Sequence, residues 1–114
     1  MQFMLKNDFA RYYLPEINNI IGKPWTLRVM LELRRDKKSR YNDLLKTLEG
    51  ISTSTLTITL KNLQAVGFVD KESFGKKPPF KVGYSLTEKG FDFLIAFYPL
   101  LKWANKKQVT VNKI

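Results

Sequence analysis

The side chains of this sequence that could bind another molecule are mainly basic groups and hydroxyls. The 114 residues include 20 Lys and Arg, 10 Asp and Glu, no His and no Cys. Without His and Cys, the chain lacks the usual general base, the commonest metal ligand and any thiol for redox or zinc chemistry. The ten acids are scattered without catalytic spacing. We therefore expect no enzyme activity, no metal and no cofactor.

The excess of positive charge points to a polyanionic partner. The formal net charge is +10 and the pI is about 9.9, a balance typical of domains that bind nucleic acid. An anionic membrane surface and plain solubility are the alternatives. Asp8, Arg11 and Glu16 interrupt any apolar leader, and the longest apolar run, residues 93–101, is far below the ~20 residues of a membrane span. We expect a cytoplasmic protein of one domain.

The stretch STSTLTITLKNL, residues 52–63, fits two kinds of secondary structure. Residues 55–60 alternate threonine with apolar residues, as a half-buried strand does. A second pattern, with the spacing of one helical face, runs through Leu56, Leu60, Leu63 and Val66. Beyond residue 60 the strand pattern meets polar residues while the helical pattern continues, so a helix is predicted over residues 52–66, with Ser52 as its N-cap.

Periodic patterns and turn residues predict the other elements. Helices are expected over residues 25–33, 41–48 and 88–106, with a shorter helix after Pro15. Strands are expected over residues 68–73 and 81–86, on either side of a turn that contains Gly75 and two prolines. Thr87 should cap the last helix and Pro99 should kink it. Residues 34–40 are interpreted as a basic turn, either solvated or touching phosphate.

The order of these elements is that of a winged helix-turn-helix. The expected fold class is mainly α with a small two-stranded β-hairpin wing (α+β), as a single domain over residues 1–114. Its expected parts are an N-terminal arm or helix (1–14), a winged-helix core with three helices (15–86) and a C-terminal dimerisation helix (87–107).

Several short motifs resemble those of the HxlR-type branch of the MarR-like winged-helix regulators. They include IIGKPWTL at residues 20–27, RYNDL at 40–44, PP at 78–79 and YSLTEKG at 84–90, followed by Trp103. The resemblance implies a homodimeric, DNA-binding transcription factor of the kind found mostly in bacteria and archaea. No residue identifies a small-molecule effector.

The sequence departs from the family pattern at two places. The family usually has a Cys ahead of its first helix, through which a subset senses oxidants, whereas this chain has Tyr12-Tyr13-Leu14 in that region. That sensing chemistry is therefore absent. The family also usually has an Arg shortly after the two prolines of the wing, and Lys81 is the best match for it here.

One side of the predicted helix over residues 52–66 is expected to face double-stranded DNA in the major groove. This recognition helix presents, opposite Leu56, the residues Thr53, Ser54, Thr57, Ile58, Lys61 and Asn62. The hydroxyls can reach phosphates or base edges, whereas a threonine methyl or Ile58 can pack on a thymine methyl. No Arg is present there to read guanine, which predicts modest direct readout biased toward A·T-rich sites.

Further basic residues are expected to contact the DNA backbone or the minor groove. On the wing, which we define as residues 74–81, these are Lys76, Lys77 and Lys81. Arg40 is expected to touch a phosphate, with Lys37 and Lys38 as further candidates. The alternative is that the wing lysines only make the hairpin tip soluble.

The last helix carries more apolar residues than one small domain needs. One stripe holds Phe91, Leu94, Tyr98 and Leu101, and a second holds Phe93, Phe97, Leu100 and Ala104. We expect one stripe to pack on its own domain and the other on a second copy. The residues proposed for the dimer interface are Phe93, Phe97, Leu100, Leu101, Ala104, Tyr12 and Tyr13. Such a dimer would place two recognition helices about 34 Å apart on an inverted-repeat operator.

Two other functions fit the same sequence. A non-specific DNA-binding protein would use the positive charge without reading bases. A winged-helix protein-interaction module would carry the basic surface incidentally.

Overall fold

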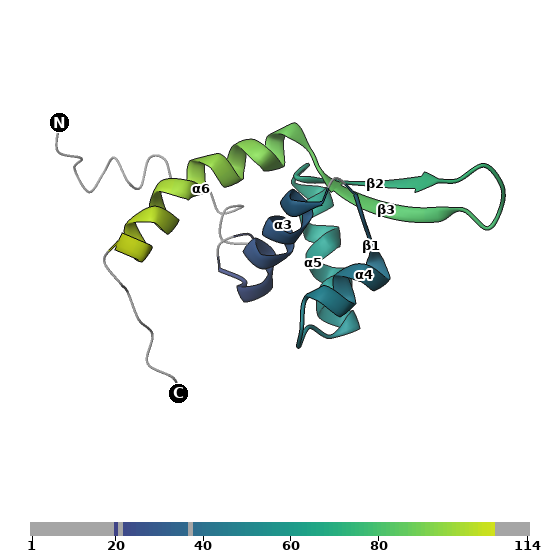
Figure 1. Ribbon diagram of the computed structural model, residues 1–114, viewed down its shortest axis with the longest axis horizontal. Helices are drawn as coiled ribbons and strands as arrows, with labels where there is room; N and C mark the ends of the chain where they lie inside the picture. Colours follow the sequence, from purple (N-terminus) through teal and green to yellow (C-terminus); the bar gives the residue numbers. More distant parts are fainter. Residues whose placement is uncertain (1–19, 21, 37, 107–114) are drawn as a thin grey trace.

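The computed structural model describes residues 20, 22–36 and 38–106. In chain order its elements are α3 (Pro24–Arg35), β1 (Ser39–Arg40), α4 (Tyr41–Thr47), α5 (Thr53–Ala65), β2 (Val69–Phe74), β3 (Lys81–Leu86) and α6 (Glu88–Lys106). Three helices are followed by a hairpin and then by a long helix (Figure 1). This is the predicted winged helix-turn-helix. The expected arm over residues 1–14 and most of the helix expected after Pro15 lie outside the described residues.

The core lies among α3, α4 and α5 because each helix turns one apolar face inward. The side chains with less than 2% exposure are those of Met30, Leu33, Leu44, Leu56, Leu60, Leu63, Val29 and Thr26. All three helices contribute to this set, and each large aliphatic side chain removed from water stabilises the fold by roughly 1.5–3 kcal/mol. The face predicted for residues 52–66 is therefore the face that α5 buries.

Both ends of α5 are formed by local hydrogen bonds that a strand could not make. The Ser52 hydroxyl accepts a hydrogen bond from the Thr55 backbone N–H at 3.1 Å, as an N-cap does. At the other end the Phe68 N–H donates to the Leu63 carbonyl at 2.9 Å. The Gly67 N–H donates to the Gln64 carbonyl at 3.0 Å, and Gly67 has a φ of 80°. This pair of bonds is a Schellman motif, and it ends α5 at Ala65, within one residue of the predicted end at residue 66.

The sheet has three strands, where the sequence predicted two. The order is β1-β3-β2, and β2 pairs with β3 from Val69↔Leu86 to Phe74↔Lys81. The additional strand, β1, lies inside the segment interpreted as a basic turn and pairs Ser39 with Tyr84. Two residues are too few to show an alternating pattern, so this strand was missed. It ties the chain just ahead of α4 to the hairpin.

Helix α6 joins the core only through its first turns. The Thr87 hydroxyl accepts a hydrogen bond from the Gly90 N–H at 3.0 Å, which confirms the predicted cap. Gly90 and Leu94 are its buried residues, and the helix then extends away from the α3–α5 bundle (Figure 1). Pro99 lies within it, and the helix continues to Lys106. The predicted kink at Pro99 stays a prediction.

Candidate nucleic-acid interface

The outer side of α5 is the surface predicted for DNA contact. Ser54, Ile58 and Lys61 are exposed there together with Thr53, while Thr57 and Asn62 are half-buried. Ile58 exposes 55% of its surface, a large fraction for an isoleucine in a short, capped helix. Thr53, Ser54, Thr57 and Ile58 line a shallow hollow of about 370 Å³. This surface therefore combines hydroxyls, methyl groups and one cation.

A residue of α4 holds the beginning of this surface in place. The Tyr41 hydroxyl donates to the Thr53 carbonyl at 2.9 Å and lies 2.9 Å from the Thr57 hydroxyl. Tyr41 begins the helix predicted over residues 41–48 and was not among the predicted DNA-contacting residues. Its hydroxyl is the signal in the sequence that points to a hydrogen-bonding role, because a position that is only apolar does not need a tyrosine.

The wing brings three lysines to the far end of the hairpin. Lys76 and Lys77 lie in the exposed loop between β2 and β3, and Lys81 is the first residue of β3. A second hollow, of about 340 Å³, joins the wing to the beginning of α4 and is lined by Arg40, Tyr41, Asn42, Pro79, Phe80, Lys81 and Val82. Arg40 and Lys81 therefore border one concave surface. Phe80, which is 53% exposed, was not among the predicted residues.

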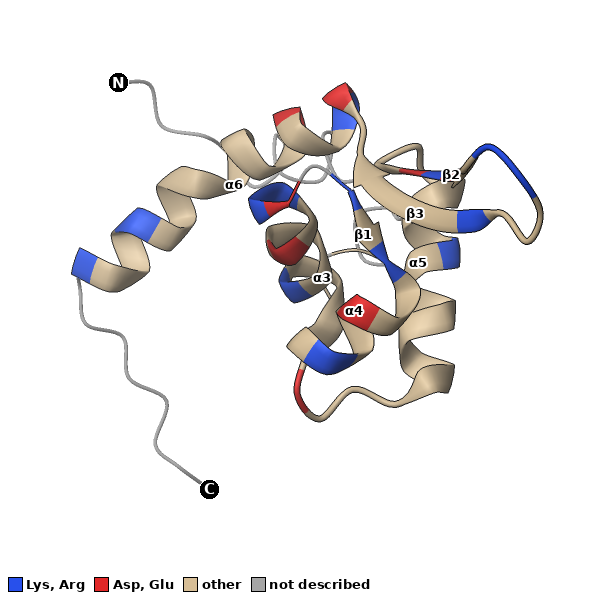
Figure 2. Ribbon diagram, turned by 45° about the vertical axis from the view of Figure 1, so that its right-hand side comes forward, with Lys and Arg blue, Asp and Glu red and all other residues tan. Residues whose placement is uncertain are grey.

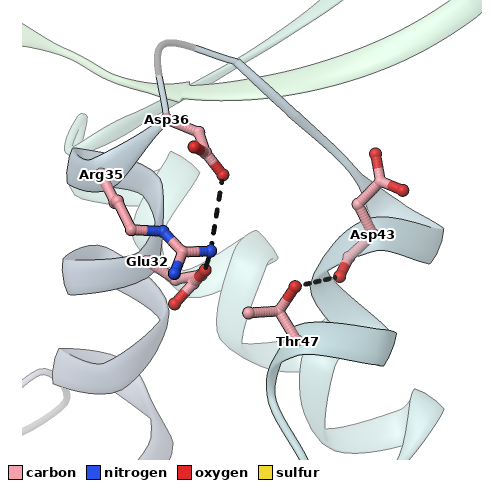
Figure 3. A network of polar contacts seen from close by, with 5 residues as sticks. All are labelled: Glu32, Arg35, Asp36, Asp43 and Thr47. Carbon is pink, nitrogen blue, oxygen red and sulfur yellow. Dashed lines mark hydrogen bonds and ion pairs between the residues drawn. The ribbon is translucent and has the colours of Figure 1, made fainter.

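The basic run over residues 34–40 is divided among different neighbours. Arg35 lies between Glu32 and Asp36, with the Asp36 carboxylate at 3.9 Å (Figure 3). The Lys38 ammonium pairs with Glu72 at 3.2 Å and stands 5.0 Å from the Phe74 ring centroid. Both charges are thereby offset by nearby acids. Arg40 is consequently the better candidate for a phosphate contact, whereas Lys37 lies outside the described residues.

Other polar contacts in the same region serve the helices themselves. Arg34 stands over the Phe91 ring at 5.5 Å from its centroid, on the side of α6. The Thr47 hydroxyl donates to the Asp43 carbonyl within α4 at 2.8 Å (Figure 3). These contacts are structural and leave the outer side of α5 untouched.

Positive charge surrounds α5 on the wing side. Lys61 is the only charged residue of α5, and Figure 2 shows further blue segments on the wing loop, at the beginning of β3 and on β1. Acidic residues lie on or beside α3 and α4, on the first turns of α6 and on β2, where Glu72 pairs with Lys38 (Figure 2). A polyanion that contacts α5 and the wing together would therefore meet cations.

The far half of α6 exposes a broad apolar surface. Its most exposed large residues are Ile95, Tyr98, Leu100, Leu101 and Trp103. Of the residues predicted for a dimer interface, Leu100 and Leu101 are exposed, while Phe93, Phe97 and Ala104 are half-buried. The Phe93 ring packs on Phe68, with centroids 4.8 Å apart, so Phe93 serves the core of its own domain. Tyr12 and Tyr13 lie outside the described residues.

Among residues 20, 22–36 and 38–106, no three acidic, His or Cys side chains are grouped so that they could hold a metal ion. None of the helices in these ranges is both long and apolar enough to cross a membrane.

The fold and its basic outer surface define a winged helix-turn-helix protein, and the sequence comparisons specify the family. Residues 20–111 match the HxlR-like helix-turn-helix family, and the chain belongs to it. An uncharacterized HTH-type transcriptional regulator of Halalkalibacterium halodurans is 33% identical over 90 residues, which are 79% of each chain. The uncharacterized HTH-type transcriptional regulator YdeP of Bacillus subtilis is 31% identical over 108 residues, 95% of this chain and 83% of YdeP.

Solved structures agree with this assignment. A MarR-family transcriptional regulator from Enterococcus faecalis superposes with a TM-score of 0.74 at 29% identity, covering 95% of this chain and 93% of that one. The reduced form of the transcriptional regulator YodB from Bacillus subtilis superposes with a TM-score of 0.70 at 26% identity, covering 91% and 94%. The protein is a transcriptional regulator with a DNA-binding helix-turn-helix, not an enzyme.

Proposed function

We propose that two copies of this chain bind one inverted repeat in double-stranded DNA and regulate transcription from it. In this proposal the recognition helix lies in the major groove and the wing lies on the backbone or in the minor groove. The observation that carries it is the outer side of α5, where exposed hydroxyl and methyl groups lie beside Lys61 with no acidic residue in the helix. A helix of this kind fits the width of the major groove.

The wing and its surroundings support contact with phosphates. Lys76, Lys77 and Lys81 are all exposed, and Arg40 borders the same hollow as Lys81. None of the salt bridges among the described residues involves these four cations. Such side chains bind through release of counterions from the DNA, which supplies affinity without reading sequence.

The exposed half of α6 supports assembly into a dimer. Leu100 and Trp103 are 52% and 53% exposed, and both lie beyond the turns that reach the core. Several large apolar side chains exposed on one element commonly mark an interface. Two-fold symmetry would give two recognition helices about one DNA turn apart, which matches an inverted repeat.

Selection of bound sequences from a random DNA pool tests this proposal directly. The expected result is an enriched inverted repeat whose half-site centres are about 10–10.5 base pairs apart or a multiple of that, together with a footprint on that sequence. Equal affinity for the selected and the random DNA would establish a non-specific DNA-binding protein instead. Binding that an acidic competitor protein abolishes, and that never gives a footprint, would favour a protein-interaction module.

A further inference from the structure

The two hydrogen bonds of Tyr41 determine which group Thr57 can offer to a ligand. A phenol has one proton to donate, and the Tyr41 hydroxyl donates it to the Thr53 carbonyl, which can only accept. At the 2.9 Å contact with Thr57, the Tyr41 oxygen must therefore accept, and the Thr57 hydroxyl must donate. The proton of Thr57 is thus directed at α4 and is not available to a base or a phosphate.

Because the Thr57 oxygen faces Tyr41, its methyl group is free to face the outer hollow. Oxygen and methyl diverge from the same Cβ, so the side chain can turn only one of them toward Tyr41. Thr57 lines the hollow with Thr53, Ser54 and Ile58, and Ile58 is the large apolar side chain among these four. Two neighbouring residues of α5, Thr57 and Ile58, therefore have aliphatic carbon that can face the outer hollow.

We propose that Ile58 and the Thr57 methyl read the 5-methyl group of a thymine, and that Tyr41 is the positioning residue that makes this readout possible. The proposal rests on the proposed function, because it requires α5 to lie in the major groove. There, a thymine is distinguished from the other bases by its methyl group, and apolar contact is the usual way to recognise it. Donation of a hydrogen bond from the Thr57 hydroxyl to a base would instead require the hydrogen bond to Tyr41 to break.

Replacement of thymine by uracil in the selected DNA isolates the methyl group. Uracil keeps every hydrogen-bonding group of thymine, so only the apolar contact is lost. Loss of one buried methyl predicts about a fourfold weaker Kd per half-site at the contacted thymine. Each thymine of the selected duplex is replaced in turn, and binding is measured by fluorescence anisotropy.

Two substitutions at Thr57 separate the methyl from the hydroxyl. Thr57→Val keeps the methyl and removes the hydroxyl, and it should discriminate thymine from uracil as the wild type does. Thr57→Ser keeps the hydroxyl and removes the methyl. For this variant the ratio of the Kd with uracil to the Kd with thymine at that position should fall toward one. The opposite pattern, or equal behaviour of the two variants, overturns the proposal. Ile58→Ala should also reduce discrimination at the same half-site.

Tyr41 is tested by loss and rescue. Tyr41→Phe removes the acceptor of the Thr57 proton, so that Thr57 can turn its hydroxyl outward, and discrimination against uracil should fall. Tyr41→Phe combined with Thr57→Val should regain it, because valine has a methyl group at both γ positions. The positioning role is excluded if Tyr41→Phe keeps the wild-type ratio of the Kd for uracil DNA to the Kd for thymine DNA. It is also excluded if the double variant does not regain that ratio. Equal thermal unfolding midpoints of the variants serve as the folding control.

The outcomes separate this proposal from the function on which it rests. If no sequence is enriched from the random pool, the sequence-specific function fails and the thymine readout fails with it. If a sequence is enriched but contains no thymine sensitive to uracil replacement, only the thymine readout is overturned.

Discussion

At the scale of single residues, side chains at the beginning of α6 connect the C-terminal end of α5 to the rest of the domain. The Thr87 hydroxyl donates to the Gly67 carbonyl at 2.6 Å while it accepts from the Gly90 N–H. The Lys89 ammonium donates to the Val66 carbonyl at 2.9 Å. The carbonyls of the two residues that follow α5 are thereby bound by residues at the beginning of α6. Positive charge near a helix C-terminus also interacts favourably with the helix dipole.

The N-cap of α5 provides the first prediction. Ser52→Ala removes the oxygen that accepts from the Thr55 N–H, and it should lower the free energy of unfolding by about 1 kcal/mol. Urea denaturation followed by circular dichroism measures the change. Ser54→Ala is the matched control, because Ser54 is an exposed serine in the first turn of the same helix, and it should change stability much less. Equal losses for the two variants would contradict a capping role.

The salt dependence of DNA binding is the second prediction at this scale. Lys61→Ala combined with Lys77→Ala removes one cation from α5 and one from the wing. If each neutralises one phosphate, the proposed dimer loses about four phosphate contacts, and the slope of log K against log salt should become less negative by about 3.6. Titrations of the selected duplex at several salt concentrations measure the slope. Lys102→Ala with Lys106→Ala removes the same charge from the far half of α6 and should leave the slope near the wild-type value.

At the scale of elements, the angle between α6 and the helix-turn-helix depends on one close approach. Gly90, in the first turn of α6, has no side chain, and a Cβ there would overlap the Phe68 backbone carbonyl oxygen. It would also lie 3.1 Å from the Leu86 side chain. The glycine therefore lets α6 begin directly against the turn that ends α5. Phe68 and Phe93 then fill the space beside this contact.

Gly90→Ala should destabilise the fold although alanine is the better helix former. The added methyl meets backbone, which cannot turn aside, and overpacking of this kind costs about 1–3 kcal/mol. Thermal unfolding should show a lower midpoint than that of the wild type. Asp92→Ala, at an exposed position of the same helix, is the control and should change the midpoint little. An unchanged midpoint for Gly90→Ala would mean that α6 packs differently.

At the scale of the whole molecule, the domain divides into a packed part and an extended part. The α3–α5 bundle and the sheet hold nearly all of the buried residues, whereas the far half of α6 extends beyond them (Figure 1). The apolar side chains in the far half of α6 are consequently not covered by the described residues of the same chain. In the proposed dimer, a second copy would cover this surface with the same surface of its own, by two-fold symmetry.

Leu100→Glu should convert the proposed dimer into a monomer. Leu100 is 52% exposed, so the substitution costs little in the isolated domain but places a charge in the proposed interface. Sedimentation velocity should show the smaller species, and affinity for the selected duplex should fall at least tenfold because the second half-site no longer binds together with the first. Lys106→Ala changes the net charge by the same amount and should remain dimeric. A dimeric Leu100→Glu variant would place the interface elsewhere.

Much of the fold could be predicted from local sequence because its signals are local. The signals that define α5 act over one or two helical turns. They are the spacing of its leucines, the N-cap at Ser52 and the helix-ending turn at Gly67. The outer side of α5 follows from the same periodicity, since a residue opposite the buried face must lie outside. The predicted DNA contacts on that side and the dimer interface stay predictions.

Tertiary structure alone decided the remaining features, because they depend on residues far apart in the chain. The strand β1 exists only through pairing with β3, more than forty positions later, and its two residues show no pattern. The same holds for the basic run: only the fold places Lys38 beside Glu72 and Arg40 beside the wing. The sequence by itself determined that α5 is a helix and which side it exposes. Contact with Tyr41 of another helix decided that Thr57 turns its hydroxyl inward, since a hydroxyl is oriented by its partner.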